Sequence, residues 1–215
     1  MNFLAHAVLA GDAANVVAGS LAGDFVKGVL YDEQYPADFL LGIRLHRRLD
    51  AFSNQNQLLR ESANRLPKAL RRIAPPCIDM LADHLLARAA LAQPADYLPD
   101  PVIWGPHSDN AAERPALLGY EDWLHSSLNT HWQRLSPSAQ RFFTHAKTTR
   151  LFSSYADFDR TSRGIGYVCE RLGRKADAAA MVQALDAAAD TLATDFAGYW
   201  PELVAEARRY RQLHE

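Results

Sequence analysis

Histidine and aspartate recur at helical spacing on segments that are otherwise apolar. His46 and Asp50 are four residues apart in GIRLHRRLDAFSN, and they continue the face of Phe39 and Ile43. Residues three, four or seven apart share one side of a helix, so both are predicted to point inward. An imidazole and a carboxylate one turn apart can bind one metal ion, or the carboxylate can orient the imidazole. Taken alone, the pair is better explained by a structural hydrogen bond.

Three further segments place the same residue types on apolar faces. Asp24 shares a helical stripe with apolar residues, where a buried carboxylate is costly unless it is paired or binds metal. Asp83 and His84 are adjacent within CIDMLADHLLAR, and His6 lies in NFLAHAV. Each has a structural alternative: a cap or ion pair for Asp24, a helix-dipole contact for Asp83, and a satisfied core position for His6.

A shared metal site explains these positions together better than packing does. We predict that Asp24, His46, Asp83 and His84 hold a divalent metal, with His6 as a further ligand. Nitrogen and oxygen ligands without sulfur suit Mn²⁺, Fe²⁺, Mg²⁺ or Zn²⁺. Such an ion lowers the pKa of bound water and stabilises charge on a phosphoryl group. Asp24 or Asp50 is then the predicted general base.

Basic residues surround the predicted site. Arg47 and Arg48 flank the pair of His46 and Asp50, and a guanidinium fork matches phosphate oxygens, so they are predicted to offset phosphoryl charge. Residues 39–72 contain eight basic and two acidic side chains, which would steer an acidic partner, unless they form solvated helix faces. The predicted partner-binding residues are Arg44, Arg65, Lys68, Arg71 and Arg72. The net charge of −2 does not favour nucleic acid.

The elements that position these residues are predicted to be helices. Strand signals are nearly absent, and 215 residues fit a single all-α domain spanning 1–215, an irregular bundle of about seven to nine helices. We expect them at about 2–9, 12–26, 36–52, 53–65, 67–92, 117–133, 136–151, 155–172 and 176–213, with Asp12, Ser53 and Ser136 as N-caps and a kink at Pro201. Five prolines between Pro94 and Pro115 predict a surface loop or insertion over 94–116.

The cysteines, the N-terminal residues and the absent motifs exclude several classes of function. Cys77 and Cys169 form no metal-binding or disulfide framework, which favours a reducing, cytoplasmic setting. We expect no signal peptide and no membrane span, because the first residues lack a basic leader and no apolar run reaches about 20 residues. Phosphate-binding glycine loops and a nucleophilic serine elbow are absent from the sequence. The histidines of the second half, among them His125 and His131, are taken to lack carboxylates at ligand spacing.

Four blocks carry a family resemblance: MNFLAHAVLA, GSLAGDFVKG, GIRLHRRLDAFSN and RRIAPPCIDMLADHLLAR, with a weaker block at DFAGYWPELVAEARR. In order and spacing they resemble bacterial acyl carrier protein phosphodiesterase. The resemblance implies a helical, HD-domain-like phosphohydrolase that uses Mn²⁺ or a similar ion, with Asp24, His46, Asp50, Asp83 and His84 as metal and catalytic residues. It also implies hydrolysis of the 4′-phosphopantetheine–serine linkage of holo acyl carrier protein, a small acidic protein.

Two alternatives stay open from the sequence. The first is an HD-like hydrolase of a nucleotide or another small phosphodiester, which would not need a basic docking surface. The second is a non-catalytic helical binding or scaffold protein, in which the acidic and histidine residues are structural or bind a stabilising metal. Nothing in the sequence indicates the oligomeric state.

Overall fold

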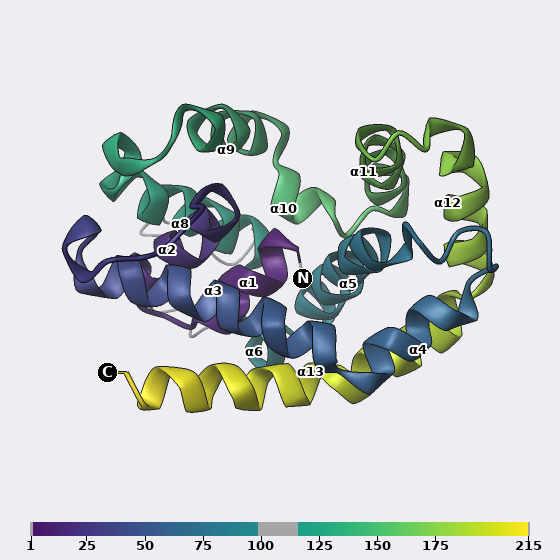
Figure 1. The fold of residues 1–215 in the computed structure, drawn as a ribbon, viewed down its shortest axis with the longest axis horizontal. Coiled ribbons are helices and arrows are strands. Elements are labelled where there is room, and N and C mark those ends of the chain that lie inside the picture. The colour runs from purple at the N-terminus through teal and green to yellow at the C-terminus, as the bar shows by residue number, and fades with distance from the viewer. Residues whose placement is uncertain (1, 99–115, 215) are drawn as a thin grey trace.

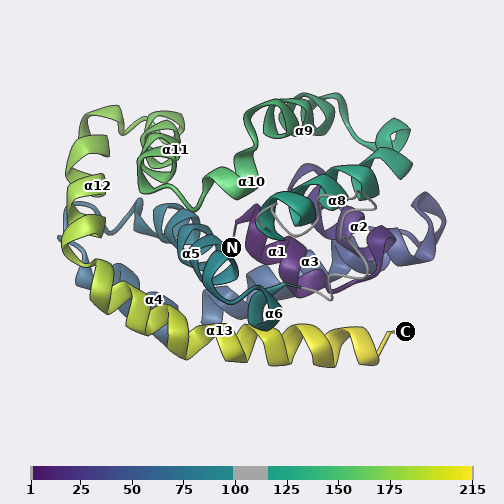
Figure 2. The ribbon, with the colours of Figure 1, turned by 180° about the vertical axis from the view of Figure 1, so that it is seen from behind.

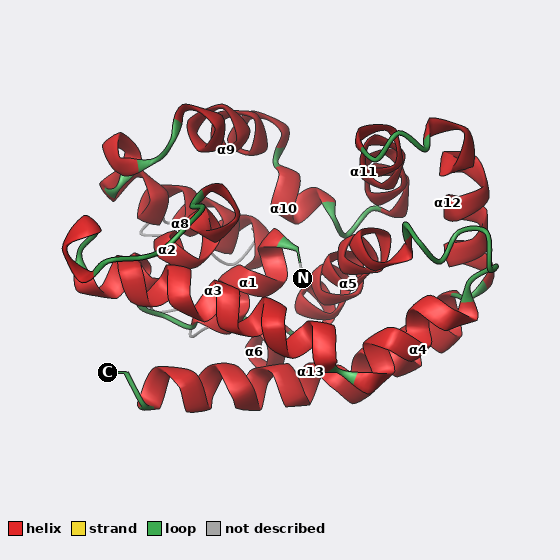
Figure 3. Cartoon of the chain, viewed as in Figure 1, coloured by secondary structure: helices red, strands yellow, loops and turns green. Residues whose placement is uncertain are grey.

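The computed structural model describes residues 2–98 and 116–214, and within these stretches the chain forms helices and no strand (Figure 3). The elements are α1 (Phe3–Ala10), α2 (Ala14–Ala22), η1 (Gly23–Phe25), η2 (Asp32–Gln34), α3 (Ala37–Gln55), α4 (Gln57–Arg65), α5 (Ala74–Ala92), α6 (Pro94–Tyr97), α8 (Ala116–Thr130), η4 (Trp132–Arg134), α9 (Pro137–Thr149), α10 (Leu151–Ser154), α11 (Phe158–Arg171), η5 (Lys175–Asp177), α12 (Ala178–Ala187) and α13 (Ala189–Gln212). The prediction of an all-α fold is confirmed.

The helices enclose a central group made of α1, α2 and α3. In Figure 1, α13 runs along the lower edge beside α4, while α9 lies across the top and α11 and α12 form the right-hand side. The reverse view in Figure 2 shows the same neighbours. Buried apolar side chains from α1 through α13 join in one continuous core. This core fixes the relative positions of α1 and α3, which carry the site described below.

Two glycines let α2 and α3 pack backbone to backbone. A Cβ atom added at Gly19 would lie 1.9 Å from the carbonyl oxygen of Phe39, and one at Gly42 would lie 2.0 Å from that of Val16. No side chain fits at such a distance, so both positions require glycine. The close approach holds the end of α2, and the η1 turn after it, against the middle of α3.

The helix boundaries differ from the predicted ones where local caps decide them. The described stretches contain twelve α-helices rather than seven to nine, because α6 and α10 are single turns and the last predicted helix is divided into α12 and α13. Ser136 caps α9 as predicted, but Asn56 and not Ser53 caps α4, through its side-chain oxygen and the Leu59 N–H. Asp12 caps nothing, since α2 starts after Ala13 without a side-chain cap.

Several of the described prolines lie in the first turn of a helix. Pro75 and Pro76 lie in the first turn of α5, so the predicted helix from residue 67 begins only at Ala74. Pro201 lies within α13. Of the predicted loop over 94–116, the first residues form α6 and residues 99–115 lie outside the described part. Among the described helices, none has the length and apolar character required to cross a bilayer.

Candidate metal centre

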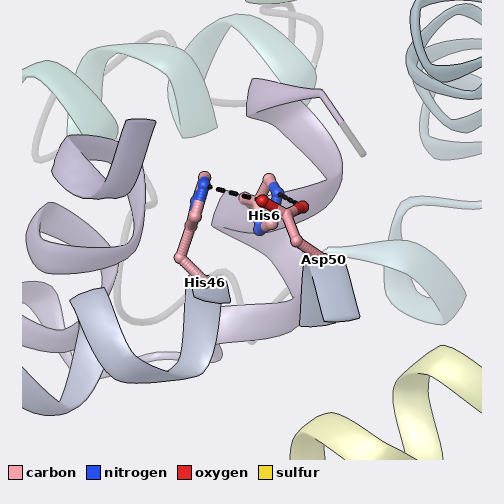
Figure 4. Close-up of side chains that lie close together, drawn as sticks. All are labelled: His6, His46 and Asp50. Carbon is pink, nitrogen blue, oxygen red and sulfur yellow. Dashed lines mark hydrogen bonds and ion pairs between the residues drawn. The ribbon is translucent and has the colours of Figure 1, made fainter. Parts of the chain in front are cut away.

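His6, His46 and Asp50 meet where α1 crosses α3 (Figure 4). Nε2 of His6 lies 3.1 Å from Oδ1 of Asp50, and Nε2 of His46 lies 3.3 Å from Oδ2 of the same carboxylate. The two imidazole rings stack, with centroids 3.7 Å apart and an interplanar angle of 19°. Asp24 reaches the group from η1, with Oδ1 3.5 Å from Nε2 of His46. We call these four residues the metal-site cluster.

The metal-site cluster is buried on its histidine side and open on its carboxylate side. His6 and His46 are 1% and 2% exposed, whereas the side chains of Asp24 and Asp50 are 49% and 39% exposed. The prediction that Asp24 is buried on the face of a helix is therefore wrong. The α-helix ends at Ala22 and the η1 turn carries Asp24 to the surface beside His46.

The donor set fits a divalent metal ion. Among the described residues, His6, His46 and Asp50 are the group whose ligand atoms, one from each residue, all lie within 4.8 Å of one another. The Nδ1 atoms of both histidines are buried and have no hydrogen-bond partner among the described residues. Two imidazoles and a carboxylate form a common ligand set for transition metals in hydrolases, and the exposed carboxylates leave room for water or substrate.

Burial and mutual charge separate the pKa values of the two histidines. Burial, together with the adjacent His46, lowers the pKa of His6 to about 4. Burial also opposes the charge on His46, but its hydrogen bonds to Asp24 and Asp50 outweigh burial and raise the pKa of His46 to about 9. Burial opposes the charge on Asp50 as well, but its hydrogen bonds with His46 and His6 outweigh burial and hold the pKa of Asp50 well below its usual range. Without metal at neutral pH, a protonated His46 therefore occupies the place between two carboxylates that a cation would take.

Backbone contacts of small residues position the two rings. A Cβ atom at Gly23 would lie 2.4 Å from Cγ of His46, so the imidazole packs on a position that only glycine can occupy. The hydroxyl of Ser20 donates to the carbonyl oxygen of His6 at 3.1 Å and ties α2 to α1. The sequence analysis missed both residues, although the GSLAGD block that contains them was singled out.

Arg47 and Arg48 are both engaged within the protein. Arg47 donates through Nη1 to the carbonyl oxygen of Gly28 and through Nη2 to that of Val26, both at 2.9 Å. Arg48 donates through Nε to the buried Glu206 of α13 at 2.6 Å. Arg47 thus holds the segment that follows Asp24, and Arg48 ties α3 to α13. Their predicted role on a phosphate stays a prediction.

The structure places Asp83 and His84 outside the metal-site cluster. The two carboxylate oxygens of Asp83 accept the backbone N–H groups of Leu4 and Ala5, each at 2.9 Å. Nδ1 of His84 lies 2.7 Å from the carbonyl oxygen of Tyr155. Burial raises the pKa of Asp83 to about 7, against the opposing effect of its two backbone hydrogen bonds. Asp83 therefore anchors the first turn of α1, which carries His6, instead of contacting His46 or Asp50.

The predicted partner-binding residues divide into paired and unpaired ones. Arg44 pairs with Asp32 at 2.6 Å, and Arg65 forms a two-pronged ion pair with the buried Asp195 at 2.7 and 2.8 Å. Arg71 donates through Nε to a backbone carbonyl. Lys68 and Arg72 are exposed, without an ion pair to any described residue. The loop that carries Lys68, Arg71 and Arg72 lies between α4 and α5 at the right-hand edge of Figure 1, at the far end of α4 from α3.

The expectation for the second-half histidines needs a correction. Glu121 precedes His125 by one helical turn, and the structure places Oε1 of Glu121 3.7 Å from Nε2 of His125. The carboxylate of Glu121 also accepts the backbone N–H groups of Phe152 and Ser153, so it caps α10. His131 contacts Asn15 through Nε2 at 2.8 Å. These histidines are held by structural contacts.

Comparison with known proteins identifies the family of this chain. A sequence profile of the family described as acyl carrier protein phosphodiesterase matches residues 1–99 and 108–203. The chain belongs to this family. Proteins named acyl carrier protein phosphodiesterase from Shigella boydii serotype 18 (strain CDC 3083-94 / BS512) and Escherichia coli (strain K12 / DH10B) are each 40% identical to it over 88 residues. That match covers 41% of this chain and 45% of each relative, so it spans less than half of the relatives' length. No solved structure matches the chain.

Proposed function

We propose that the protein is a metal-dependent phosphodiesterase that hydrolyses the 4′-phosphopantetheine–serine linkage of holo acyl carrier protein. The products are apo carrier protein and 4′-phosphopantetheine. The observation that carries the proposal is the solvent-open cluster of His6, His46 and Asp50 in a member of this family. The 40% identical relatives are named for this activity, which supports the choice of a phosphodiester over other substrates.

The proposed metal ligands are His6, His46 and Asp50, with Asp24 at the open side. Mn²⁺ is the first choice, and Mg²⁺ or Fe²⁺ also suits nitrogen and carboxylate donors. When bound, the ion supplies a water of lowered pKa and offsets charge on the phosphoryl oxygens. The exposed carboxylates allow a bulky phosphodiester to approach from solvent, as a modified serine on another protein requires.

The side chains of this protein have separate proposed tasks. Asp24 is the most exposed member of the metal-site cluster, and we assign it the role of general base, which accepts the proton of the attacking water. Arg47 holds the backbone at Val26 and Gly28, which fixes the η1 segment that carries Asp24. Asp83 holds the start of α1, and thereby His6, through its two backbone hydrogen bonds. The seryl oxygen of the carrier protein is the leaving group.

Intact-protein mass spectrometry of holo acyl carrier protein tests the proposal. We expect incubation with the protein and Mn²⁺ to convert the holo form to the apo form, and a chelator to prevent the conversion. Asp24→Asn is the matched variant, because it removes the charge with little change in shape and should leave the fold intact. If no metal supports release from the carrier protein while a nucleotide diester is cleaved, the small-substrate alternative replaces this proposal. If nothing is cleaved, a scaffold role replaces it.

A further inference from the structure

A group of half-buried phenylalanines borders the metal-site cluster. Phe3 of α1, Phe25 of η1 and Phe142 of α9 are all only partly buried. The ring of Phe142 stacks on that of Phe3 with centroids 4.4 Å apart, and it lies 5.5 Å from that of Phe25. Phe25 directly follows Asp24, and Phe3 precedes His6 by one helical turn. The rings therefore connect α9 to the two elements that carry Asp24 and His6.

The segment after Asp24 adds exposed apolar surface. Val29 is 68% exposed and Tyr31 is 58% exposed, and both follow η1 within seven residues of Asp24. The described part of the chain has six exposed large apolar side chains, and two of the six lie in this one short segment. Exposed apolar surface beside polar residues is typical of protein interaction sites. Partly exposed aromatic residues are also enriched at the centres of such sites.

Unpaired cations lie beside these aromatic residues. Lys27 follows Phe25 by two residues and Arg141 precedes Phe142 on α9. Both are exposed, and neither forms an ion pair with any residue that the structure describes. The α9 sequence, PSAQRFFTHAKTT, contains no acidic residue, and neither does the segment FVKGVLY after Asp24. Apart from the carboxylates of the metal-site cluster itself, these two segments therefore present positive charge around the phenylalanines.

We propose that Phe3, Phe25 and Phe142, together with Lys27 and Arg141, form the docking face for an acidic carrier protein. This inference rests on the proposed function, which requires the modified serine of another protein to reach Asp24 and Asp50. Carboxylates of the partner pair with Lys27 and Arg141, and apolar residues around its serine cover the phenylalanines. Charge complementarity selects the carrier protein as the occupant and steers its approach.

The basic loop between α4 and α5 is the alternative docking surface for the carrier protein. Lys68 and Arg72 of that loop are likewise exposed and likewise form no ion pair with any described residue, so they serve as a matched comparison. The loop that carries them lies at the edge of the molecule next to α12 in both Figure 1 and Figure 2, away from α1. A carrier protein bound there would not present its serine to the metal-site cluster.

Direct binding of apo carrier protein separates the two surfaces without using turnover. The paired variants are Lys27→Glu with Arg141→Glu, and Lys68→Glu with Arg72→Glu, which change the net charge equally. Calorimetric titration should show the first pair weakening binding by roughly tenfold or more, while the second changes it by less than about twofold. The first pair should also lose most of the salt dependence of binding. Mn²⁺ binding should be unchanged in both, which verifies an intact site.

Each outcome of the binding experiment either supports or overturns the docking face. Equal weakening by both variants, greater weakening by Lys68→Glu with Arg72→Glu, or no binding of carrier protein by the unmodified chain would overturn the docking face. Binding that depends on Lys27 and Arg141 without any release of phosphopantetheine would support the docking face and refute the proposed function. The failure of one is therefore distinguishable from the failure of the other.

Discussion

On α3, His46 and Asp50 contact each other and His6, and both carboxylates of the cluster remain open to solvent. On α5, Asp83 and His84 lie in an equally apolar run, yet each is bonded to a backbone group of another segment. A buried carboxylate needs either a cation or hydrogen-bond donors. Asp83 accepts backbone N–H groups at a helix N-terminus, whereas the half-exposed Asp50 contacts the imidazoles of His6 and His46, which together form a candidate ligand set for a cation. The same residue types thus form the candidate metal site on α3 and helix-anchoring contacts on α5.

The largest expected effect comes from Asp50→Asn. The amide keeps the shape but loses the negative charge that joins His6 to His46, so metal affinity and transition-state stabilisation should both fall. We expect kcat/KM for the carrier protein to drop by roughly 10²–10³-fold. Far-ultraviolet circular dichroism should show an unchanged helix content, since Asp50 is partly exposed. Turnover close to that of the unmodified protein would remove Asp50 from the site.

Asp83→Ala should mainly lower the free energy of unfolding. The substitution leaves the N–H groups of Leu4 and Ala5 buried without partners, which costs about 2–4 kcal/mol of unfolding free energy. Urea denaturation of the metal-free protein measures this loss. Asp83→Asn is the matched control, because its side-chain oxygen retains one of the two acceptor positions and should recover part of the stability. A stable Asp83→Ala variant that has lost metal binding would instead make Asp83 a ligand.

Gly23→Ala tests how tightly the backbone positions His46. The added methyl group would lie 2.4 Å from the imidazole, so the ring must move away from His6 and Asp50. We expect the affinity for Mn²⁺ to fall by roughly 10–100-fold. Gly166→Ala is the control, because a Cβ at that position in α11 meets nothing within 4 Å. Equal Mn²⁺ affinity in both variants would show that the ring position is not critical.

A further expected effect, which needs no substitution, is a pH dependence of metal binding. Because the pKa of His46 is raised from 6.5 to about 9, its protonated form stabilises the metal-free fold fully below pH 6.5, and this stability is lost as the pH rises toward 9. Metal must displace that proton, so Mn²⁺ affinity should rise over the same interval. Anaerobic titrations at several pH values measure it. An affinity that stays constant across this range would place the ion away from His46.

The α-helical class and the pairing of His46 with Asp50 were predictable because both depend on the periodicity of a single helix. Helical periodicity predicted that Asp24 lies near His46, but it did not predict that α2 ends at Ala22 and that the η1 turn exposes Asp24. The role of Asp83 was not predictable, because its partners lie 79 and 78 residues away on α1. Periodicity shows which side chains point inward, but not which backbone groups they meet there.

Calorimetric titration of Mn²⁺ into the unmodified protein, Asp50→Asn and Asp83→Asn is the most direct test of the contrast between α3 and α5. We predict one class of tight site in the unmodified protein, its loss in Asp50→Asn, and its retention in folded Asp83→Asn. Loss of the site in Asp83→Asn with retention in Asp50→Asn would contradict the account and move the metal centre to α5.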